Sequence, residues 1–221
     1  MRTLICIPCM DTVSTVFFRA MMNLQCVGDV EYQITQSTLI YNARNQLCHD
    51  AIVRGFDRML WFDSDMEFPP DTMLRLMDDM DAGRELVSGL YFGRHEPIRP
   101  TIFTEIEYQK VEGSNQVIPY AKTYDEYPED KVFEIAGCGF GCVMVTVDLC
   151  RRIADKFGLP FSPLIGFGED ISFCKRATDL GVKLYCDSAI KCGHQKHIMV
   201  TEDTWKNTRA ANRRDPDGTT V

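Results

Sequence analysis

The fold is decided by a stretch in which a short apolar run stops at two aspartates, Arg58-Met59-Leu60-Trp61-Phe62-Asp63-Ser64-Asp65-Met66-Glu67. Met59–Phe62 is too short for a buried helix and is rich in bulky apolar residues, so it predicts a strand buried on both faces. Asp63 and Asp65 then lie at its carboxyl end, where open α/β sheets gather their ligands. Further Asp-x-Asp tripeptides at 79–81 and 215–217 lie in a polar helix end and a polar tail. On spacing alone, ligand binding and a chance pairing of acids stay equally open.

Alternating strands and helices precede and follow this stretch. The apolar run Thr3–Ile7, ended by Pro8, predicts a first parallel strand. Apolar residues at helical spacing predict a helix with Asp11 or Thr12 as its N-cap and Gly28 past its end. The remaining elements predicted up to residue 90 are strands at 31–35 and 85–90 and helices at 41–55 and 70–81. This alternation is typical of a doubly wound layer.

Beyond Leu90 the pattern changes. Residues 91–100 form a turn-rich connection, and a strand at 101–104 is followed by a polar stretch, 105–130, which predicts a solvated hairpin or a mobile loop. Three alternating glycines in a strand at 136–145 allow backbone or ligand to approach closely. Helices are predicted at 148–157 and 171–180, with a loop at 158–167 between them, and a strand at 182–186. Residues 201–221 are a polar tail with a short helix around Trp205.

Composition sets outer limits on function. The chain has 221 residues, enough for one large α/β domain with a sizeable core. Its formal net charge of −8 opposes a general polyanion-binding surface, although a local basic groove stays open. No stretch approaches the length of an apolar membrane span, and Met1–Pro8 is too short for a signal peptide. We therefore expect a soluble, cytoplasmic protein without integral membrane association.

The ten cysteines lie in apolar segments without an export signal, which predicts reduced, buried thiols rather than disulfides. A zinc site is the alternative, with ligands drawn from Cys6, Cys9, Cys186, Cys192, His194 and His197. Structural zinc usually takes two tight ligand pairs in a small, loop-rich module, and that arrangement is not seen here.

A second acidic pair follows a glycine-rich turn, at Glu169 and Asp170. Both residues precede an amphipathic helix, where the helix dipole and free N–H groups favour negative charge. The pair is therefore either a helix cap or part of a functional site.

The joint order of these motifs resembles a nucleotide-sugar glycosyltransferase of the A fold, family-2-like and containing Asp-x-Asp. The segments that carry the resemblance are Arg44-Asn45, 60–65, the glycine-rich 136–145, 168–177 and Gly193-His194. The resemblance covers Thr3 to His197 and implies an α/β, single-domain, Rossmann-like fold whose mixed, mostly parallel central sheet is flanked by helices. Its catalytic domain would span 1–200, with a nucleotide-binding half at 1–90 and an acceptor half at 91–200. The chain is compact for this family and lacks an obvious acceptor domain.

The resemblance also implies roles for individual residues. Asp65, Asp63 and His194 would bind Mn²⁺ or Mg²⁺, with His197 as the rival histidine and Asp63 contacting either the metal through water or the ribose. Mn²⁺ is slightly favoured, because it tolerates a nitrogen ligand better. The residues implied in donor binding are Pro8, Met10, Asp11, Arg44, Asp63, Ser64 and Asp65. Arg94 and Arg99 are further candidates for phosphate or acceptor contacts.

The implied reaction is hexosyl transfer from a nucleotide-diphosphate sugar, with a UDP-sugar favoured, to an acceptor hydroxyl. A divalent cation would stabilise the charge that grows on the departing diphosphate. If the reaction inverts the anomeric centre, Asp170 would take the acceptor proton and Glu169 would bind sugar or acceptor. If it retains configuration, Asp170 would bind the sugar.

Two other classes stay open. A nucleotidyltransferase shares the layer and the metal carboxylates but typically has a glycine-rich basic loop after its first strand, and residues 8–12 contain neither glycine nor lysine. A non-catalytic nucleotide- or carbohydrate-binding module of the same fold is the other class. The acceptor is left open: the resemblance makes a glycan or lipid-linked sugar the common case, and a protein side chain or a modified DNA base is the alternative, with the acidic net charge weakly opposing DNA.

Overall fold

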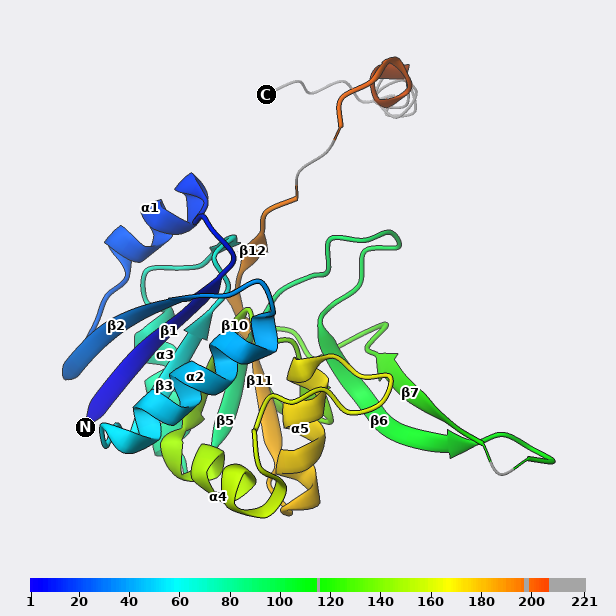
Figure 1. Cartoon of the computed structure of the whole chain (residues 1–221). Coiled ribbons are helices and arrows are strands. Elements are labelled where there is room, and N and C mark those ends of the chain that lie inside the picture. The colour runs from blue at the N-terminus through cyan, green and yellow to red at the C-terminus, as the bar shows by residue number, and fades with distance from the viewer. Residues whose placement is uncertain (115, 197–198, 207–221) are drawn as a thin grey trace.

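The protein is described from a computed structural model that covers residues 1–114, 116–196 and 199–206. A seven-stranded sheet with strand order β2-β1-β3-β10-β5-β11-β8 forms its centre (Figure 1). The strands are β1 (Arg2–Cys9), β2 (Asp29–Gln36), β3 (Arg58–Phe62), β5 (Leu86–Leu90), β8 (Val132–Ile135), β10 (Cys142–Thr146) and β11 (Leu184–Lys191). Five strands run in one direction, whereas β10 and β8 pair antiparallel with their neighbours. The predicted mixed, mostly parallel sheet is confirmed.

Helices cover both faces of the sheet, as predicted for a Rossmann-like layer (Figure 1). They are α1 (Thr15–Asn23), α2 (Ile40–Val53), α3 (Thr72–Asp81), α4 (Val147–Phe157) and α5 (Glu169–Asp179). One core cluster joins α2, α4 and α5 to the sheet, and a second joins α1 and α3 to its other face. β3 contributes Trp61 to the first cluster and Phe62 to the second. This strand is buried on both faces, which confirms the prediction from its apolar run.

The first helix begins later than the sequence suggests. Its N-cap is Ser14, whose Oγ accepts a hydrogen bond from the Phe17 N–H at 3.0 Å, whereas Asp11 and Thr12 lie in the preceding loop. The helix also ends at Asn23, well before Gly28. Serine is as good an N-cap as aspartate, so local preference alone did not decide between these positions.

The predicted glycine-rich strand at 136–145 is divided in two. β9 (Gly137–Cys138) pairs with β6, and β10 starts only at Cys142, in the central sheet. The interruption at 139–141 accommodates Tyr91, because a Cβ on Gly139 would lie 2.1 Å from the Tyr91 hydroxyl oxygen. The glycines therefore allow a close approach, as predicted, but they do so at a break between two strands.

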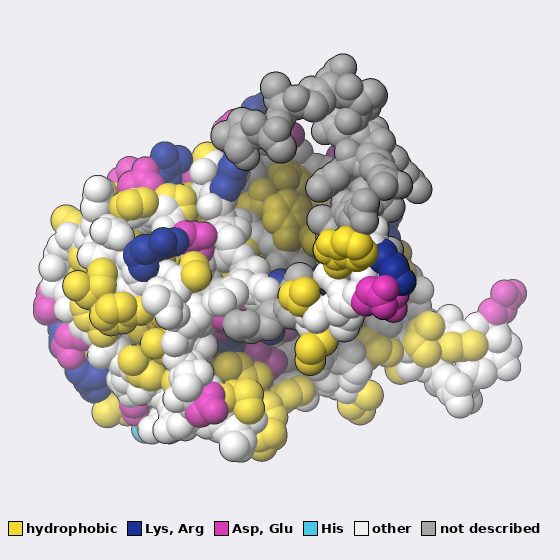
Figure 2. All heavy atoms as spheres, turned by 90° about the horizontal axis from the view of Figure 1, so that it is seen from above, with side chains coloured by type: hydrophobic (Ala, Val, Ile, Leu, Met, Phe, Trp, Pro, Cys, Tyr) yellow, Lys and Arg dark blue, Asp and Glu magenta, His cyan; other side chains and the backbone are white. Residues whose placement is uncertain are grey.

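A hairpin projects from the body of the molecule (Figures 1 and 2). It consists of β6 (Ile102–Lys110) and β7 (Val117–Thr123), which pair antiparallel and are largely exposed. This confirms the hairpin as the form taken by most of the polar stretch 105–130. The strand predicted at 101–104 is longer than expected and forms one arm of the hairpin.

A two-residue ladder is the feature that sequence periodicity could not show. β4 (Met66–Glu67) pairs antiparallel with β12 (Gly193–His194), and Met66 lies opposite His194. The ladder joins the chain just after Asp65 to a segment far downstream. It therefore brings His194 to the carboxyl end of β3.

Other boundaries shift slightly. The strand predicted at 182–186 runs instead from Leu184 to Lys191, and α4 begins at Val147, one residue earlier than expected. Residues 202–206 are helical, as predicted around Trp205, and the rest of the tail lies outside the described residues. All ten cysteines are free thiols and nine are buried, but Cys26 is exposed, contrary to expectation. Within the described ranges, no helix is long and apolar enough to cross a membrane.

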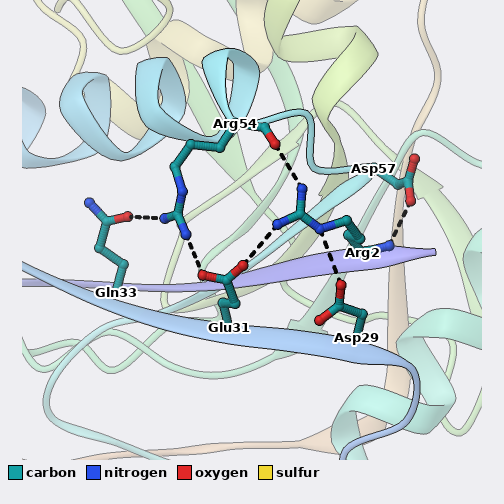
Figure 3. A network of polar contacts seen from close by, with 6 residues as sticks. All are labelled: Arg2, Asp29, Glu31, Gln33, Arg54 and Asp57. Atoms are coloured by element: carbon teal, nitrogen blue, oxygen red, sulfur yellow. Dashed lines mark hydrogen bonds and ion pairs between the residues drawn. The ribbon is translucent and has the colours of Figure 1, made fainter.

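The amino ends of β1 and β2 are tied to the end of α2 by a polar network (Figure 3). The Arg2 guanidinium donates to Asp29 at 3.2 Å, to Glu31 at 2.9 Å and to the Arg54 carbonyl at 2.8 Å. The Arg2 backbone N–H donates to Asp57 at 2.6 Å. Exposed pairs of this kind contribute about 0.2–1 kcal/mol each, so the network mainly orders the amino ends of these strands. The candidate site lies at the other end of the strands, where their carboxyl ends meet.

Candidate functional site

A cavity of about 250 Å³ opens at the carboxyl ends of the central strands. Ten residues singled out from the sequence line it: Pro8, Met10, Arg44, Asp63, Ser64, Asp65, Arg94, Glu169, Asp170 and His194. Asp11 lines a neighbouring cavity of about 630 Å³, which shares Met10, Ser64, Asp65 and Arg94 with the first. Arg99 lines neither cavity and instead donates to Asp125 at 3.3 Å. His197, the rival histidine, lies outside the described residues.

His194 is held with one ring nitrogen directed at Asp65. Its Nδ1 lies 2.9 Å from the Phe92 carbonyl oxygen, and its Nε2 lies 3.5 Å from Asp65 Oδ1. Because a carbonyl can only accept a hydrogen bond, the proton of the neutral ring resides on Nδ1, and Nε2 keeps its lone pair. This is the arrangement found in histidine ligands, where an outer partner orients the ring.

The two side chains also shift each other's pKa. Burial alone would raise the pKa of Asp65, but the hydrogen bond and charge of the protonated His194 ring, in which Nε2 also carries a proton, together with Arg94 lower it below its usual value. Burial would lower the pKa of His194, but the contacts with Asp65 and the Phe92 carbonyl raise it. Asp65 is therefore ionised at neutral pH, as a cation ligand must be.

The donor set suits a cation that is completed by substrate. Two adjacent ligands of an octahedral ion with bonds of about 2.1 Å lie about 3 Å apart, close to the observed separation of Asp65 and His194. No group of three or more His, Cys, Asp or Glu side chains among the described residues is arranged to hold a metal ion. Cations of this class commonly bind one or two protein side chains plus water and phosphate, so Asp65 and His194 fit that role.

Asp63 faces a different partner. Arg44 Nη2 donates to Asp63 Oδ1 at 2.7 Å, and Arg44 Nε donates to Glu169 Oε1 at 3.3 Å. The Arg44 guanidinium is buried and lies against three aromatic rings, those of Trp61, Phe140 and Phe161, at 5.5, 5.5 and 5.9 Å from their centroids. Arg44 lines the cavity, yet its main contacts are two carboxylates.

Asp170 is a partly buried carboxylate in the first turn of α5. Burial, reinforced by the negative charges of Glu169 and Asp63, raises the pKa of Asp170 to about 6, against the lowering effects of the Ile171 N–H and Arg44. The N-cap of α5 is Gly168, and neither acid is the capping residue. Asp170 Oδ1 accepts a hydrogen bond from the N–H of the next residue, Ile171, at 2.7 Å. This contact between sequence neighbours is weak support for the interpretation of the acidic pair as a helix cap.

Tyr91 supports the candidate site from outside the cavity lining, and sequence reasoning did not single it out. Its buried hydroxyl accepts a hydrogen bond from the Gly141 N–H at 3.1 Å, and its ring meets the His194 ring edge-on at a centroid distance of 5.5 Å. Burial, with the charges of Asp63 and Asp170, raises its pKa well above the usual range. The signal that points to it is its position directly after β5, at the same sheet edge as Asp63.

The cavity lining contains more acidic than basic side chains. Four carboxylates line it, from Asp63, Asp65, Glu169 and Asp170, against the two guanidinium groups of Arg44 and Arg94. Charges of both signs are interspersed over the face seen in Figure 2, without a continuous basic area on the visible residues. A polyanionic ligand would therefore need a further positive charge to bind here.

Comparison with known proteins supports the fold. No protein-family model and no curated protein matches the chain. The crystal structure of A197 from STIV aligns with a TM-score of 0.62 at 20% identity, covering 89% of this chain and 87% of that one. GalNAc-T7, crystallised with UDP, GalNAc and Mn²⁺, aligns with a TM-score of 0.59 at 9% identity, covering 94% of this chain but only 47% of its own length. The chain therefore has a glycosyltransferase-A-like fold.

Proposed function

We propose that the chain is a cation-dependent glycosyltransferase that moves a hexosyl group from a nucleotide-diphosphate sugar, favouring UDP, to an acceptor hydroxyl. The observation that carries this proposal is the acid-lined cavity in which His194 meets Asp65 at the carboxyl end of β3. The same fold occurs in a protein crystallised with UDP, GalNAc and Mn²⁺.

The charge balance of the cavity favours a divalent cation. Its lining has two more carboxylates than guanidinium groups, and a diphosphate ester adds about two further negative charges. Repulsion on this scale opposes donor binding unless a divalent cation enters with the nucleotide. Asp65 and His194 are the side chains that would hold it, and Mn²⁺ suits their mixed oxygen and nitrogen ligands better than Mg²⁺.

The donor fits across the two adjoining cavities. Pro8, Met10 and Asp11 at the exit of β1 would border the base, and Asp63 and Ser64 would contact the ribose. When bound, the cation supplies a Lewis acid that offsets the charge developing on the diphosphate. Arg44 holds Asp63 and Glu169 in position through one hydrogen bond to each carboxylate.

Asp170 would take the proton from the acceptor hydroxyl in an inverting transfer. A general base works best when its pKa lies near the working pH, and the raised pKa of Asp170, about 6, meets that condition. Glu169, fixed by Arg44 Nε at 3.3 Å, would bind the sugar or the acceptor.

Thermal unfolding with candidate donors tests this function. We expect UDP and UDP-sugars at about 100 times their Kd to raise Tm by about 5 °C with Mn²⁺ present, because they stabilise the native state by about 2.7 kcal/mol. EDTA or Asp65→Ala should abolish the shift, whereas Asp125→Ala, an exposed acid outside the cavity, should preserve it. Slow hydrolysis of the donor sugar without acceptor would separate an enzyme from a binding module. Equal nucleotide affinity in EDTA and Mn²⁺ would contradict the proposal.

A further inference from the structure

We propose that Arg94 is an exchangeable counter-ion that binds Asp65 in the free protein and moves to the donor diphosphate when a divalent cation occupies Asp65. This inference rests on the proposed function and adds a phosphate-binding residue to it. It also gives the site a way to bind metal and nucleotide together rather than separately.

The position of Arg94 suits both states. Its Nη1 lies 2.5 Å from Asp65 Oδ2, while His194 approaches the other carboxylate oxygen at 3.5 Å. Its side chain lines both adjoining cavities, at the wall that they share with Asp65. A diphosphate bound to a cation on Asp65 would therefore lie within reach of this guanidinium.

Arg94 is also the more exposed and less tightly held of the two arginines in the cavity lining. The side chain of Arg44 is 3% exposed and is committed to two carboxylates, whereas that of Arg94 is 45% exposed and its contact is a single ion pair. A solvent-accessible ion pair is weak, so it can be exchanged at small cost.

The backbone that carries Arg94 is held beside the site. The Gly93 N–H donates to the Arg99 carbonyl at 2.9 Å, and Phe92 pairs with Pro100 in an antiparallel bridge. The Phe92 carbonyl contacts His194, and Lys196 donates to Glu96 at 2.9 Å. The connection therefore keeps Arg94 close to Asp65, and the long side chain alone can make the exchange.

Electrostatic interactions determine when Arg94 leaves Asp65 for the diphosphate. A cation on Asp65 neutralises the carboxylate that holds Arg94 and repels the guanidinium at short range. The diphosphate that arrives with the cation offers oxygens whose geometry matches the arginine fork. Arg94 should therefore compete with Mn²⁺ alone and cooperate with Mn²⁺ and nucleotide together.

This competition predicts opposite effects of one substitution. Arg94→Ala should bind Mn²⁺ alone about two- to five-fold more tightly than wild type, because the competing ion pair is lost. In saturating Mn²⁺ it should bind UDP about ten-fold more weakly or worse, because a charged hydrogen bond to phosphate is lost. Mn²⁺ binding is read from the electron paramagnetic resonance signal of the free ion, and UDP binding by calorimetry. Arg99→Ala, on the same connection but outside both cavities, should match wild type in both measurements.

The outcomes separate this inference from the proposed function. If the wild type binds UDP with Mn²⁺ but Arg94→Ala shows unchanged UDP affinity, or does not gain Mn²⁺ affinity, the role of Arg94 is overturned and the proposed function stands. If the wild type binds no Mn²⁺ and none of the nucleoside diphosphates tried, both are overturned.

Discussion

Arg44 donates hydrogen bonds to both Asp63 and Glu169, and so a single guanidinium joins the end of β3 to the start of α5. The two acids are 106 positions apart in the sequence, and they belong to the two acidic motifs that the sequence analysis treats separately. The side chain of Arg44 is 3% exposed, and its attraction to these carboxylates raises its pKa although burial alone would lower it. The cavity floor is therefore one ion-paired unit rather than two independent acidic motifs.

Replacing Arg44 should damage stability more than any surface arginine does. Arg44→Met leaves two partly buried carboxylates without their partner, and we expect a loss of about 2–3 kcal/mol in the free energy of unfolding. Urea unfolding at pH 7.5 measures this loss in the free energy of unfolding. Arg151→Met, which removes an exposed pair with Asp148, is the matched control and should change stability by about 0.5 kcal/mol or less. A loss of similar size in both variants would mean that the bridge has no special role.

The pH dependence of transfer should report Asp170. Because its pKa is raised to about 6 and the base must be ionised, kcat/KM should fall about ten-fold per unit below pH 6 and level off above pH 7. Asp170→Asn should keep donor affinity but lose about two to four orders of magnitude in transfer. Near-normal turnover in this variant would remove Asp170 from the role of base. Arg44→Met should move the profile to higher pH, since Arg44 lowers the pKa of Asp170.

Local sequence patterns were sufficient for much of the fold. The apolar run of β3, the acids that end it and the alternation of helices and strands follow from short-range chemistry, and the structure confirms them. The sequence analysis also singled out ten residues that the folded chain brings to the lining of one cavity.

Long-range pairing decided the rest. His194 reaches Asp65 through β4 and β12, two-residue strands too short to show any periodicity. The sequence predicts that Arg44 contacts the base or the phosphates of the donor. In the structure it is buried among aromatic rings and pairs with two acids that only the folded chain brings near it. Tyr91 was missed because its role depends on the glycines that make room for it.

The contact between Tyr91 and Gly139 can be tested by a double-mutant cycle. Gly139→Ala places a Cβ 2.1 Å from the Tyr91 hydroxyl oxygen, and we expect a loss of about 1–3 kcal/mol from overpacking. Tyr91→Phe alone should cost about 1–3 kcal/mol, because it leaves the buried Gly141 N–H without its acceptor. The double variant should be clearly less destabilised than the sum, because removing the hydroxyl relieves the clash. Gly93→Ala, whose Cβ would lie 3.7 Å from its nearest neighbour, is the control, and strict additivity would contradict the clash.

A partly buried acid far from the cavity should make the protein less stable at neutral pH. Burial, together with repulsion from Asp187, raises the pKa of Asp79 to about 6 against the opposing effect of Arg84, and its buried Oδ2 has no hydrogen-bond partner among the described residues. The unfolded chain releases this proton near pH 4, so the folded state holds it between about pH 4 and 6 and pays a growing electrostatic cost as pH rises through that window. Asp79→Asn should therefore raise the free energy of unfolding by about 1–2 kcal/mol at pH 7.5 and by only about a third of that at pH 4.5. Urea titrations at both pH values measure the difference, with Asp155→Asn, which replaces an exposed acid in α4, as the control. An equal gain at both pH values would assign the effect to packing or helix propensity instead of charge.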